Sequence, residues 1–309
     1  MLARRPFALA VTLAAAGSLA LTGCSSGKTV KDTGKSASVG SVAANTSLHD
    51  KLPAAIKAKG ELVMATDPTY APIEFTKSGG GYQGFDIDLA NAIGKKLGVK
   101  VVVQKAVFDT ILTGLNGGRF DFSMSAFTDN TDREKGNDFV TYFKAGTSIG
   151  VKKGNPKHVE KMEDLCGLKV AAERGTIQAT ALLKTKADGA ITLKGQCLKD
   201  GKKAPIPVIL PDQGGVNQAL VAGRADAFTG DTPVVAYQGK LVGGQIEVAG
   251  ETTDEGPYGI AFKKGSPLVP IFQKAVTQLM QDGTYTKIIN TWGLQAGAVT
   301  ESKINGANG

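Results

Sequence analysis

Hydrophobic positions along the chain follow two periods in turn. Runs in which every second residue is apolar, or in which β-branched residues gather, predict strands; runs with apolar residues three and four positions apart predict helices. Strands are predicted at 61–66, 73–75, 99–104, 120–124, 168–172, 207–210 and 225–230. Helices are predicted at 89–97, 108–115, 177 to about 184, 213–221, from 131 onward and after 233. Strands that alternate with helices favour an α/β fold with a mostly parallel sheet.

Polar residues at the predicted helix starts are candidate caps. Asp86 or Asp88 is expected to cap the helix at 89–97. Thr131 followed by Glu134 fits a capping box, so a helix is expected to begin at Thr131.

Two stretches of the chain resemble each other. LNGGRFDFS begins at Leu115 and LVAGRADAF begins at Leu220. The aligned pairs are Gly118 with Gly223, Arg119 with Arg224, Asp121 with Asp226 and Ala126 with Asp231. Generic helix-to-strand chemistry could produce this likeness. If it reflects two similar α/β units that face each other, ligands bind beyond the carboxyl ends of the strands, with Ser125 and Asp231 on opposite walls of one cleft.

A polar loop follows the predicted strand at 120–124 and offers Ser125, Thr128 and Arg133. A helix N-terminus favours anions, and a guanidinium beside two hydroxyl groups suits a carboxylate bound in bidentate fashion. On this stretch alone, a surface arginine on a solvated helix is the simpler interpretation.

The composition is that of a globular protein. Of 309 residues, 42% are hydrophobic and 21% charged, which leaves room for two domains. The formal charge is +8. Arg4 and Arg5 contribute two of these positive charges, residues 25–47 contribute a net two more, and the remaining +4 is scattered along the chain. Without a basic stripe, the charge argues against a nucleic-acid-binding protein.

The N-terminus has the pattern of an export signal, because Arg4 and Arg5 precede an apolar run at 7–20. Leu-Thr-Gly-Cys, which ends at Cys24, resembles a bacterial lipobox, whose cysteine becomes the lipidated first residue of the mature protein. A plain signal peptide and a transmembrane anchor are the alternatives, although the run is short for a bilayer. Residues 25–47 have few large apolar side chains and are expected to form a flexible tether.

Two cysteines remain, Cys166 and Cys197. Because an exported chain meets an oxidising compartment, we expect a disulfide between them, with free thiols or metal ligands as alternatives. The two histidines, His49 and His158, lie in no ligand-spaced cluster, so we expect no metal site and no cofactor.

Several motifs occur in an order that is typical of one protein family. They are YAPIEF, GFDIDLANAIGKKLG, GRFD with FTDNTDR, LKVAAERGTIQ, GRADAFTGDTPV, PYGIAFKKGSPL and DGTYTKIINTWG. Each motif alone is weak, but their order and spacing are specific, and together they cover about 61–294. The chain resembles the polar amino-acid-binding branch of the extracytoplasmic solute-binding proteins (family 3) that serve ABC importers.

This resemblance implies two α/β lobes joined by two crossing strands, the type II periplasmic-binding-protein-like fold. We expect a signal peptide at 1–23, a tether at 24–47, one lobe at 48–147 and 260–309, and the other at 148–259. Hinges are expected near 145–148 and 258–259, with the cleft closing on its ligand. We also expect a monomer outside the cytoplasm, held by its lipid at the outer face of the cell membrane, with permease subunits as partners.

The resemblance also implies ligand contacts. Arg133 corresponds to the residue that binds the ligand's α-carboxylate, and Asp231 to the partner of its α-ammonium. The other residues expected near the carboxylate are Thr128, the backbone around Ser125 and Ala126, and Thr176, Ile177 and Gln178 at a helix start of the second lobe. Tyr70 and Phe108 correspond to aromatic walls, Asp67 lies where the ligand side chain is often recognised, and Glu173 is expected to assist from the second lobe.

Each of these positions also has a simpler structural interpretation. Tyr70 could pack within its loop, Phe108 could anchor a helix start in the core, and Glu173 could be solvated. Asp67 and Asp231 could be turn or cap residues. The chain also departs from the family pattern: Asn130-Thr131-Asp132-Arg133 replaces Thr-Pro-Glu-Arg, Ala126 replaces a small polar residue or glycine, and Ile177 replaces threonine.

The sequence therefore predicts the substrate-binding component of an ABC importer, and not an enzyme, that captures a polar amino acid such as glutamine, glutamate or a basic amino acid. An enzyme of the same fold, similar to cyclohexadienyl or arogenate dehydratases and acting on a small carboxylate, is the alternative. The sequence has no Ser-His-Asp set, nucleophile elbow or phosphate-binding glycine loop. It does not name the amino acid, because Asp67 and Glu173 could favour a cationic side chain or accept from an amide.

Overall fold

The centre of the molecule is an eight-stranded sheet of mixed direction. The computed structural model describes residues 42–307; the expected leader, Cys24 and most of the expected tether lie outside the described residues. Across the sheet, the strands are β11 (Ile206–Leu210), β8 (Lys169–Glu173), β12 (Ala227–Asp231), β7 (Asn137–Lys152), β13 (Ile246–Lys263), β6 (Phe122–Ser123), β1 (Glu61–Thr66) and β5 (Lys100–Lys105).

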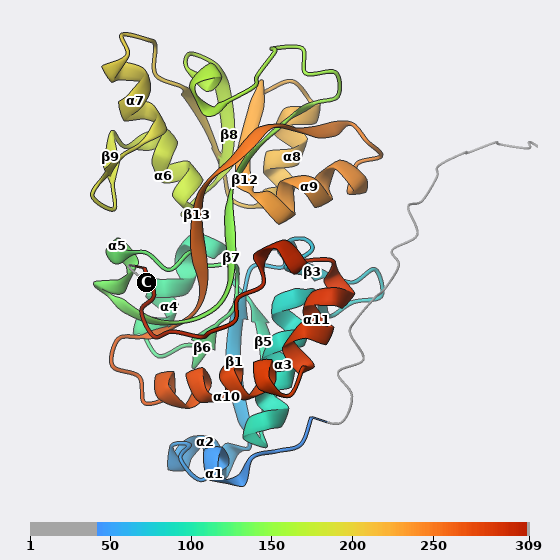
Figure 1. Cartoon of the computed structure of the whole chain (residues 1–309), viewed down its shortest axis with the longest axis vertical. Coiled ribbons are helices and arrows are strands. Elements are labelled where there is room, and N and C mark those ends of the chain that lie inside the picture. Colours follow the sequence, from blue (N-terminus) through green and yellow to red (C-terminus); the bar gives the residue numbers. More distant parts are fainter. Residues whose placement is uncertain (1–41, 308–309) are drawn as a thin grey trace, which may run out of the picture. The chain divides into compact units, whose positions relative to one another are not determined.

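Two long antiparallel strands, β7 and β13, divide this sheet. On one side β6, β1 and β5 run parallel to one another, and on the other side β12, β8 and β11 do so. Figure 1 shows β7 and β13 running from one half of the structure to the other. Their pairing shifts register three times between Ala249 and Gly259, so the ladder is interrupted where the chain passes between the halves. One of these shifts lies at Tyr258 and Gly259, where a hinge is expected; the hinge motion itself stays a prediction.

Each half has its own hydrophobic core, so the chain forms two lobes. Two clusters of buried residues lie around β1, β5 and β6, and two others lie around β8, β11 and β12. In the first lobe the helices are α1 (Thr46–His49), α2 (Ala54–Lys59), α3 (Phe85–Leu97), α4 (Ile111–Asn116), α5 (Thr131–Glu134), α10 (Val269–Gln281) and α11 (Thr284–Trp292). In the second lobe they are α6 (Ile177–Leu183), α7 (Leu193–Lys199), α8 (Gln213–Val221) and α9 (Thr232–Leu241).

Two small sheets complete the structure. One has three strands, β2 (Thr69–Tyr70), β3 (Glu74–Thr76) and β4 (Tyr82–Gln83), and the other pairs β9 (Lys186–Ala187) with β10 (Ala190–Ile191). Cys166 and Cys197 form a disulfide within the second lobe, with their Cα atoms 5.7 Å apart, as expected. Within residues 42–307, no helix is both long and apolar enough to cross a bilayer.

The sequence repeat has the same geometry in both lobes. Gly118 and Gly223 end their helices with φ values of 73° and 74°, a conformation that favours glycine. Asp121 then exchanges two hydrogen bonds with the backbone of Val63, at 2.7 and 2.9 Å. Asp226 exchanges the same two bonds with the backbone of Lys169, at 2.9 and 2.8 Å. The repeated residues therefore make one helix-to-strand connection twice, once in each lobe.

Two predicted caps are wrong. Helix α3 begins at Phe85 with Gly84 as its N-cap, so Asp86 and Asp88 lie inside its first turn. Asp86 is fully buried and accepts hydrogen bonds from the hydroxyl of Tyr142 at 2.8 Å and the backbone N–H of Ala126 at 3.1 Å. Gly84 takes the cap position because its φ is 132° and a Cβ there would lie 2.2 Å from a backbone oxygen.

Helix α5 begins at Thr131 as predicted, but Thr131 is not its cap. The side chain of Asn130 accepts the N–H of Arg133 at 2.9 Å and caps the helix instead. The hydroxyl of Thr131 donates to Asp188. The predicted strand at 120–124 is also shorter, since β6 contains only Phe122 and Ser123.

Candidate functional site

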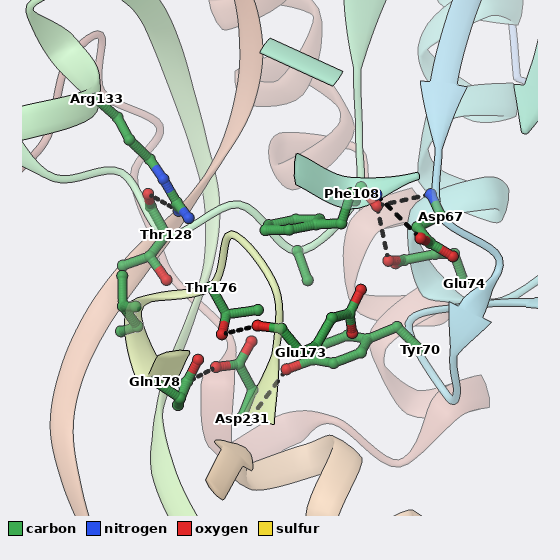
Figure 2. Close-up of a pocket in the computed structure, with 13 residues that line it drawn as sticks. Asp67, Tyr70, Glu74, Phe108, Thr128, Arg133, Glu173, Thr176, Gln178 and Asp231 are labelled. Carbon is green, nitrogen blue, oxygen red and sulfur yellow. Dashed lines mark hydrogen bonds between the residues drawn. The ribbon is translucent and has the colours of Figure 1, made fainter. Parts of the chain in front are cut away.

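A cavity lined by thirteen residues lies where the lobes meet. All twelve ligand-binding residues predicted from the sequence line it: Asp67, Tyr70, Phe108, Ser125, Ala126, Thr128, Arg133, Glu173, Thr176, Ile177, Gln178 and Asp231. A thirteenth lining residue, Glu74, was missed. Figure 2 shows that these side chains come from both lobes and surround a common space.

The strands of the central sheet deliver the key acids to this cavity. Glu173 is the last residue of β8, Asp231 is the last residue of β12, and Asp67 directly follows β1. Parallel strands bring their carboxyl ends to one edge of a sheet, where ligands of α/β proteins usually bind. The repeat at Leu115 and Leu220 therefore correctly pointed to Ser125 and Asp231 as residues of one cleft.

Arg133 lies at one end of the cavity and is held by backbone oxygens of both lobes. Its Nη1 donates to the carbonyl of Thr128 at 2.8 Å, and its Nη2 donates to the carbonyl of Gly175 at 3.0 Å. The guanidinium also lies over the rings of Phe108 and Phe127, 5.7 and 5.2 Å from their centroids. Burial lowers the pKa of Arg133 to about 10, so the side chain keeps its charge at neutral pH. A guanidinium with five N–H donors still has donors for an anion.

Phe108 both lines the cavity and packs in the hydrophobic core of the first lobe. Its ring stacks on that of Phe127, with centroids 4.4 Å apart, and belongs to a buried cluster of the first lobe. The same residue lines the cavity, and its backbone N–H donates to Asp67 at 3.0 Å. Core packing therefore fixes one aromatic wall of the site.

Asp231 is buried at the end of β12, where the second lobe lines the cavity. Its carboxylate accepts from the amide of Gln178 at 2.7 Å and from the hydroxyl of Tyr258 at 2.6 Å. Its backbone N–H donates to the hydroxyl of Tyr70 at 3.1 Å, which ties the two lobes together. Burial raises the pKa of Asp231, while these donors and the charge of Arg133 lower it. The residue is thus not merely a helix cap, and α9 receives no side-chain cap from it.

Asp67, Glu74 and Glu173 form a second group of acids in the cavity. Each has one buried carboxylate oxygen without a hydrogen-bond partner among the described residues: Asp67 Oδ1, Glu74 Oε2 and Glu173 Oε2. Burial raises the pKa of all three, and repulsion between these acids and their acidic neighbours raises it further. Figure 2 shows Asp67 and Glu74 on the side of Phe108 away from Arg133. A buried carboxylate without a partner is unfavourable, so this end of the cavity is suited to a cationic or strongly donating group.

Ser125 and Ala126 belong with these acids more than with Arg133. The hydroxyl of Ser125 donates to Glu74 at 3.0 Å and accepts from the backbone N–H of Asp67 at 2.9 Å. The N–H of Ala126 donates to Asp86 at 3.1 Å, and Ala126 has a φ of 51°, a conformation that favours glycine. The hydroxyl of Ser125 and the N–H of Ala126 are therefore already engaged within the protein.

Thr176 is the N-cap of α6. Its hydroxyl accepts from the N–H of Ala179 at 3.1 Å and donates to the carbonyl of Glu173 at 2.7 Å. Ile177 and Gln178 follow in the first turn and also line the cavity. This side chain thus orders the helix start rather than presenting a free hydroxyl to a ligand.

Glu74 was missed although the sequence holds a signal for it. It lies between Ile73 and Phe75 in a short extended segment, and it is 1% exposed. Strand alternation places an acid between two apolar residues on the opposite side from them, with no turn or cap to explain it. An unexplained acid inside an apolar motif can mark a site residue.

The match to known proteins covers nearly all of the described chain. Residues 62–295 match the bacterial extracellular solute-binding proteins, family 3. The chain is 31% identical over 255 residues to the arginine-binding protein ArgT of Corynebacterium glutamicum, which covers 82% of this chain and 81% of ArgT. It is 27% identical to the L-cystine-binding protein TcyJ of Escherichia coli over 77% of this chain and 84% of TcyJ.

Solved structures agree with this assignment. An ancestral arginine-binding protein bound to arginine has a TM-score of 0.67 and 36% identity, covering 75% of this chain and 98% of that protein. An ancestral amino acid-binding protein, described as a precursor of cyclohexadienyl dehydratase, has a TM-score of 0.65 and 35% identity, covering 77% and 97%. With two α/β lobes, paired long strands between them and an interlobe cavity, the chain has the type II periplasmic-binding-protein fold and belongs to the bacterial extracellular solute-binding proteins, family 3.

Proposed function

We propose that this protein is the substrate-binding component of an ABC importer and that its ligand is an amino acid with a cationic side chain, L-arginine first. The observation that carries the proposal is the charge of the cavity. Among the described residues, its lining contains four carboxyl groups and one guanidinium. The zwitterionic part of an amino acid pairs with one group of each sign, so three acids remain for the side chain.

The residues of the cavity divide by role. Arg133 binds the α-carboxylate together with Thr128 and the start of α6, and Asp231 binds the α-ammonium. The aliphatic part of the ligand lies between the rings of Tyr70 and Phe108. Asp67, Glu74 and Glu173 accept hydrogen bonds from the distal guanidinium through oxygens that are unpartnered in the structure.

The named relatives support this choice without deciding it. ArgT and the ancestral protein are named for arginine, whereas TcyJ is named for L-cystine. Family membership alone therefore leaves several amino acids open. The three acids of this cavity favour a cation over a neutral side chain, because only a cation compensates the negative charge of their ionised form.

The placement in the cell and the domain limits complete the proposal. Cys24 carries a lipid that holds the mature protein at the outer face of the cell membrane, residues 24–47 tether it, and the protein works as a monomer with its permease. The first lobe comprises residues 48–147 and 260–309, and the second comprises 148–259. Support for these limits comes from the hydrophobic clusters, of which two lie almost wholly in each lobe.

A binding role is favoured over a dehydratase role. The curated relatives described above are named as binding proteins, although one structural neighbour is a precursor of a dehydratase. The two roles are separated by incubating the protein with prephenate and L-arogenate and following aromatic products. Turnover would support the enzyme, and its absence together with arginine binding supports the receptor.

A thermal-shift screen with the twenty natural amino acids and L-citrulline tests the ligand. Ligand at 100 times its Kd stabilises the native state by about 2.7 kcal/mol, so binding is visible as a higher Tm. We expect the largest shift for L-arginine and a much smaller one for L-citrulline, which is its neutral analogue of nearly the same shape. A larger shift for L-glutamine or L-citrulline than for L-arginine would overturn the assignment of a cationic ligand.

A further inference from the structure

The segment after α11 lies beyond the family match, which ends at residue 295. It nevertheless lies beside β7, to which an isolated β-bridge and several hydrogen bonds connect it. The backbone of Lys303 bonds to Thr141 at both its N–H and its carbonyl, each at 2.8 Å. Ile304 bridges to Val140, and the N–H of Asn305 donates to the carbonyl of Phe139 at 3.0 Å. Figure 1 shows this dark red segment ending beside α5, the helix that carries Arg133.

The end of this segment contacts the loop that presents Arg133. We call residues 128–134 the clamp loop. The N–H of Gly306 donates to Oδ2 of Asp129 at 2.7 Å, and the N–H of Ala307 donates to Oε1 of Glu134 at 3.1 Å. These two acids flank Arg133 in the sequence, so the clamp loop is held on both sides of its functional residue.

The two acids need such donors because they lie close together. Asp129 is 2% exposed, and one of its oxygens has no partner among the described residues. Burial raises the pKa of Asp129 to about 7; the N–H of Gly306 lowers it, and the neighbouring carboxyl of Glu134 raises it. Without the N–H groups of the C-terminal segment, repulsion and lost hydrogen bonds favour movement of both acids away from each other.

We infer that residues 303–307 brace the clamp loop and thereby pre-organise Arg133 for the ligand carboxylate. Asp129 and Glu134 are positioning residues in this device, since they act through Arg133 and do not line the cavity. A site whose supporting contacts are fixed in advance loses less conformational freedom when the ligand binds. The inference rests on the proposed function only in that the ligand carries an α-carboxylate.

Isothermal titration calorimetry on two substituted chains and one shortened chain tests whether the C-terminal segment positions Arg133. Asp129→Ala removes the acceptor for Gly306, and a chain that ends at Glu301 removes the whole segment. The matched control is Ser302→Ala, which deletes a buried hydrogen bond of 2.7 Å between Ser302 and the carbonyl of Thr141 at the other end of the segment. The probes are L-arginine and agmatine, which is arginine without its carboxylate.

We expect Asp129→Ala and the shortened chain to bind L-arginine roughly tenfold more weakly, the effect of about one charge-assisted hydrogen bond. Their affinity for agmatine should change by less than about twofold, because agmatine does not use the clamp. Ser302→Ala should leave both affinities unchanged even if its Tm falls by as much as that of Asp129→Ala. Equal losses for both probes, or no loss for L-arginine in folded Asp129→Ala, would overturn the inference.

Failure of the proposed ligand is distinguishable from failure of the brace. If the unmodified protein does not bind L-arginine, the assignment of L-arginine as the ligand is wrong. The same variants are then measured with the amino acid that gives the largest thermal shift and with its decarboxylated amine, since every α-amino acid presents the same carboxylate. Loss for the acid alone supports the brace, and equal behaviour of the two probes contradicts it.

Discussion

The two ends of the cavity differ in how their charges are balanced. At one end, the guanidinium of Arg133 and the carboxylate of Asp231 offer one charge of each sign, and both groups are already held by hydrogen bonds from the protein. At the other end, Asp67, Glu74 and Glu173 have raised pKa values and unpartnered oxygens.

In the proposed function, one end of the cavity binds the α-carboxylate and α-ammonium that all amino acids share, and the other end binds the side chain that distinguishes them. The end with Arg133 and Asp231, which we call the balanced end, has one charge of each sign, as does the zwitterion that every α-amino acid carries. Its groups can therefore be held in place before a ligand binds. In the proposed function a ligand cation completes the acidic end, so this end would select one amino acid from the others. Substitutions at the two ends should therefore differ in kind: those at the first end weaken all ligands, and those at the second change the order of ligands.

Arg133→Ala should have the largest effect. It removes the proposed partner of the α-carboxylate, and we expect a loss of about 3 kcal/mol, or more than 100-fold in Kd, for every amino acid that binds. Isothermal titration calorimetry with L-arginine measures it. Arg119→Ala, at an exposed arginine, is the control. A loss restricted to cationic ligands would contradict the division between the two ends.

Asp231→Asn should rank second. The amide preserves the shape but removes the charge that is proposed to pair with the α-ammonium, and it places a donor against either Tyr258 or Gln178. We expect about 2 kcal/mol, or roughly 30-fold, for L-arginine and the same factor for any second amino acid that binds. A Tm measured without ligand shows whether the fold is retained. Affinity within twofold of the unmodified protein would mean that the ammonium lies elsewhere.

Glu173→Gln should act on selectivity. It retains shape and hydrogen-bonding capacity while removing one charge from the acidic end, so L-arginine is expected to lose about 1 kcal/mol, or fivefold. The affinity for L-citrulline should stay constant or rise. Glu160→Gln, at an exposed acid, is the control. The decisive quantity is the ratio of the Kd for L-citrulline to the Kd for L-arginine. If this ratio is the same in the variant and the unmodified protein, Glu173 does not contribute to selectivity.

The affinity for L-arginine should also depend on pH more than that for a neutral amino acid. The acidic end has raised pKa values, so a bound cation that favours the ionised carboxylates releases protons. Affinity should therefore rise with pH, on the order of threefold between pH 5.5 and 7.5 if a fraction of one proton is released. Titrations in buffers of different ionisation enthalpy count the protons directly. An affinity that falls over this range would contradict the sign.

The free energy of unfolding of the ligand-free protein should fall as the pH rises, whereas the affinity for L-arginine should rise. Asp86 and Asp129 have pKa values raised to about 7, mainly by burial, so between about pH 4 and 7 the folded state holds more protons than the unfolded state. Their stabilising contribution is complete at the acidic limit of this window and is lost as the pH rises to about 7. Asp138 and Asp282 have lowered pKa values and act below this window. Urea unfolding at pH 5 and 7 should give the higher free energy at pH 5.

The sequence predicted the lobes and most of the cavity because local signals and topology agreed there. Helix α8 and strand β1 have the predicted bounds, since glycines and polar residues mark their ends. Twelve of the lining residues were predicted from family positions, and the repeat at Leu115 and Leu220 independently placed Ser125 and Asp231 together. A signal repeated at two levels was therefore reliable.

What the sequence did not reveal depends on distant partners. Asp86 has the local pattern of a cap, but its role is set by Tyr142, which lies 56 positions away. The C-terminal segment reads as a Gly-rich tail, and its order comes from acceptors in β7 and the clamp loop. No local periodicity encodes a backbone N–H that bonds to a remote carboxylate, so such contacts appear only in the folded structure.

The pairing of Thr147 with Thr253 has a practical consequence for engineering. The chain passes between the lobes at adjacent points on two neighbouring strands, so an exchange of residues 148–252 between family members needs only two splice sites. Glu173, Gln178 and Asp231 travel with that cassette, while Arg133 and Asp67 stay behind. Hybrids made in this way would exchange the second-lobe residues of both ends of the cavity while the first-lobe residues stay constant, so they would separate the contributions of the two lobes to ligand selection.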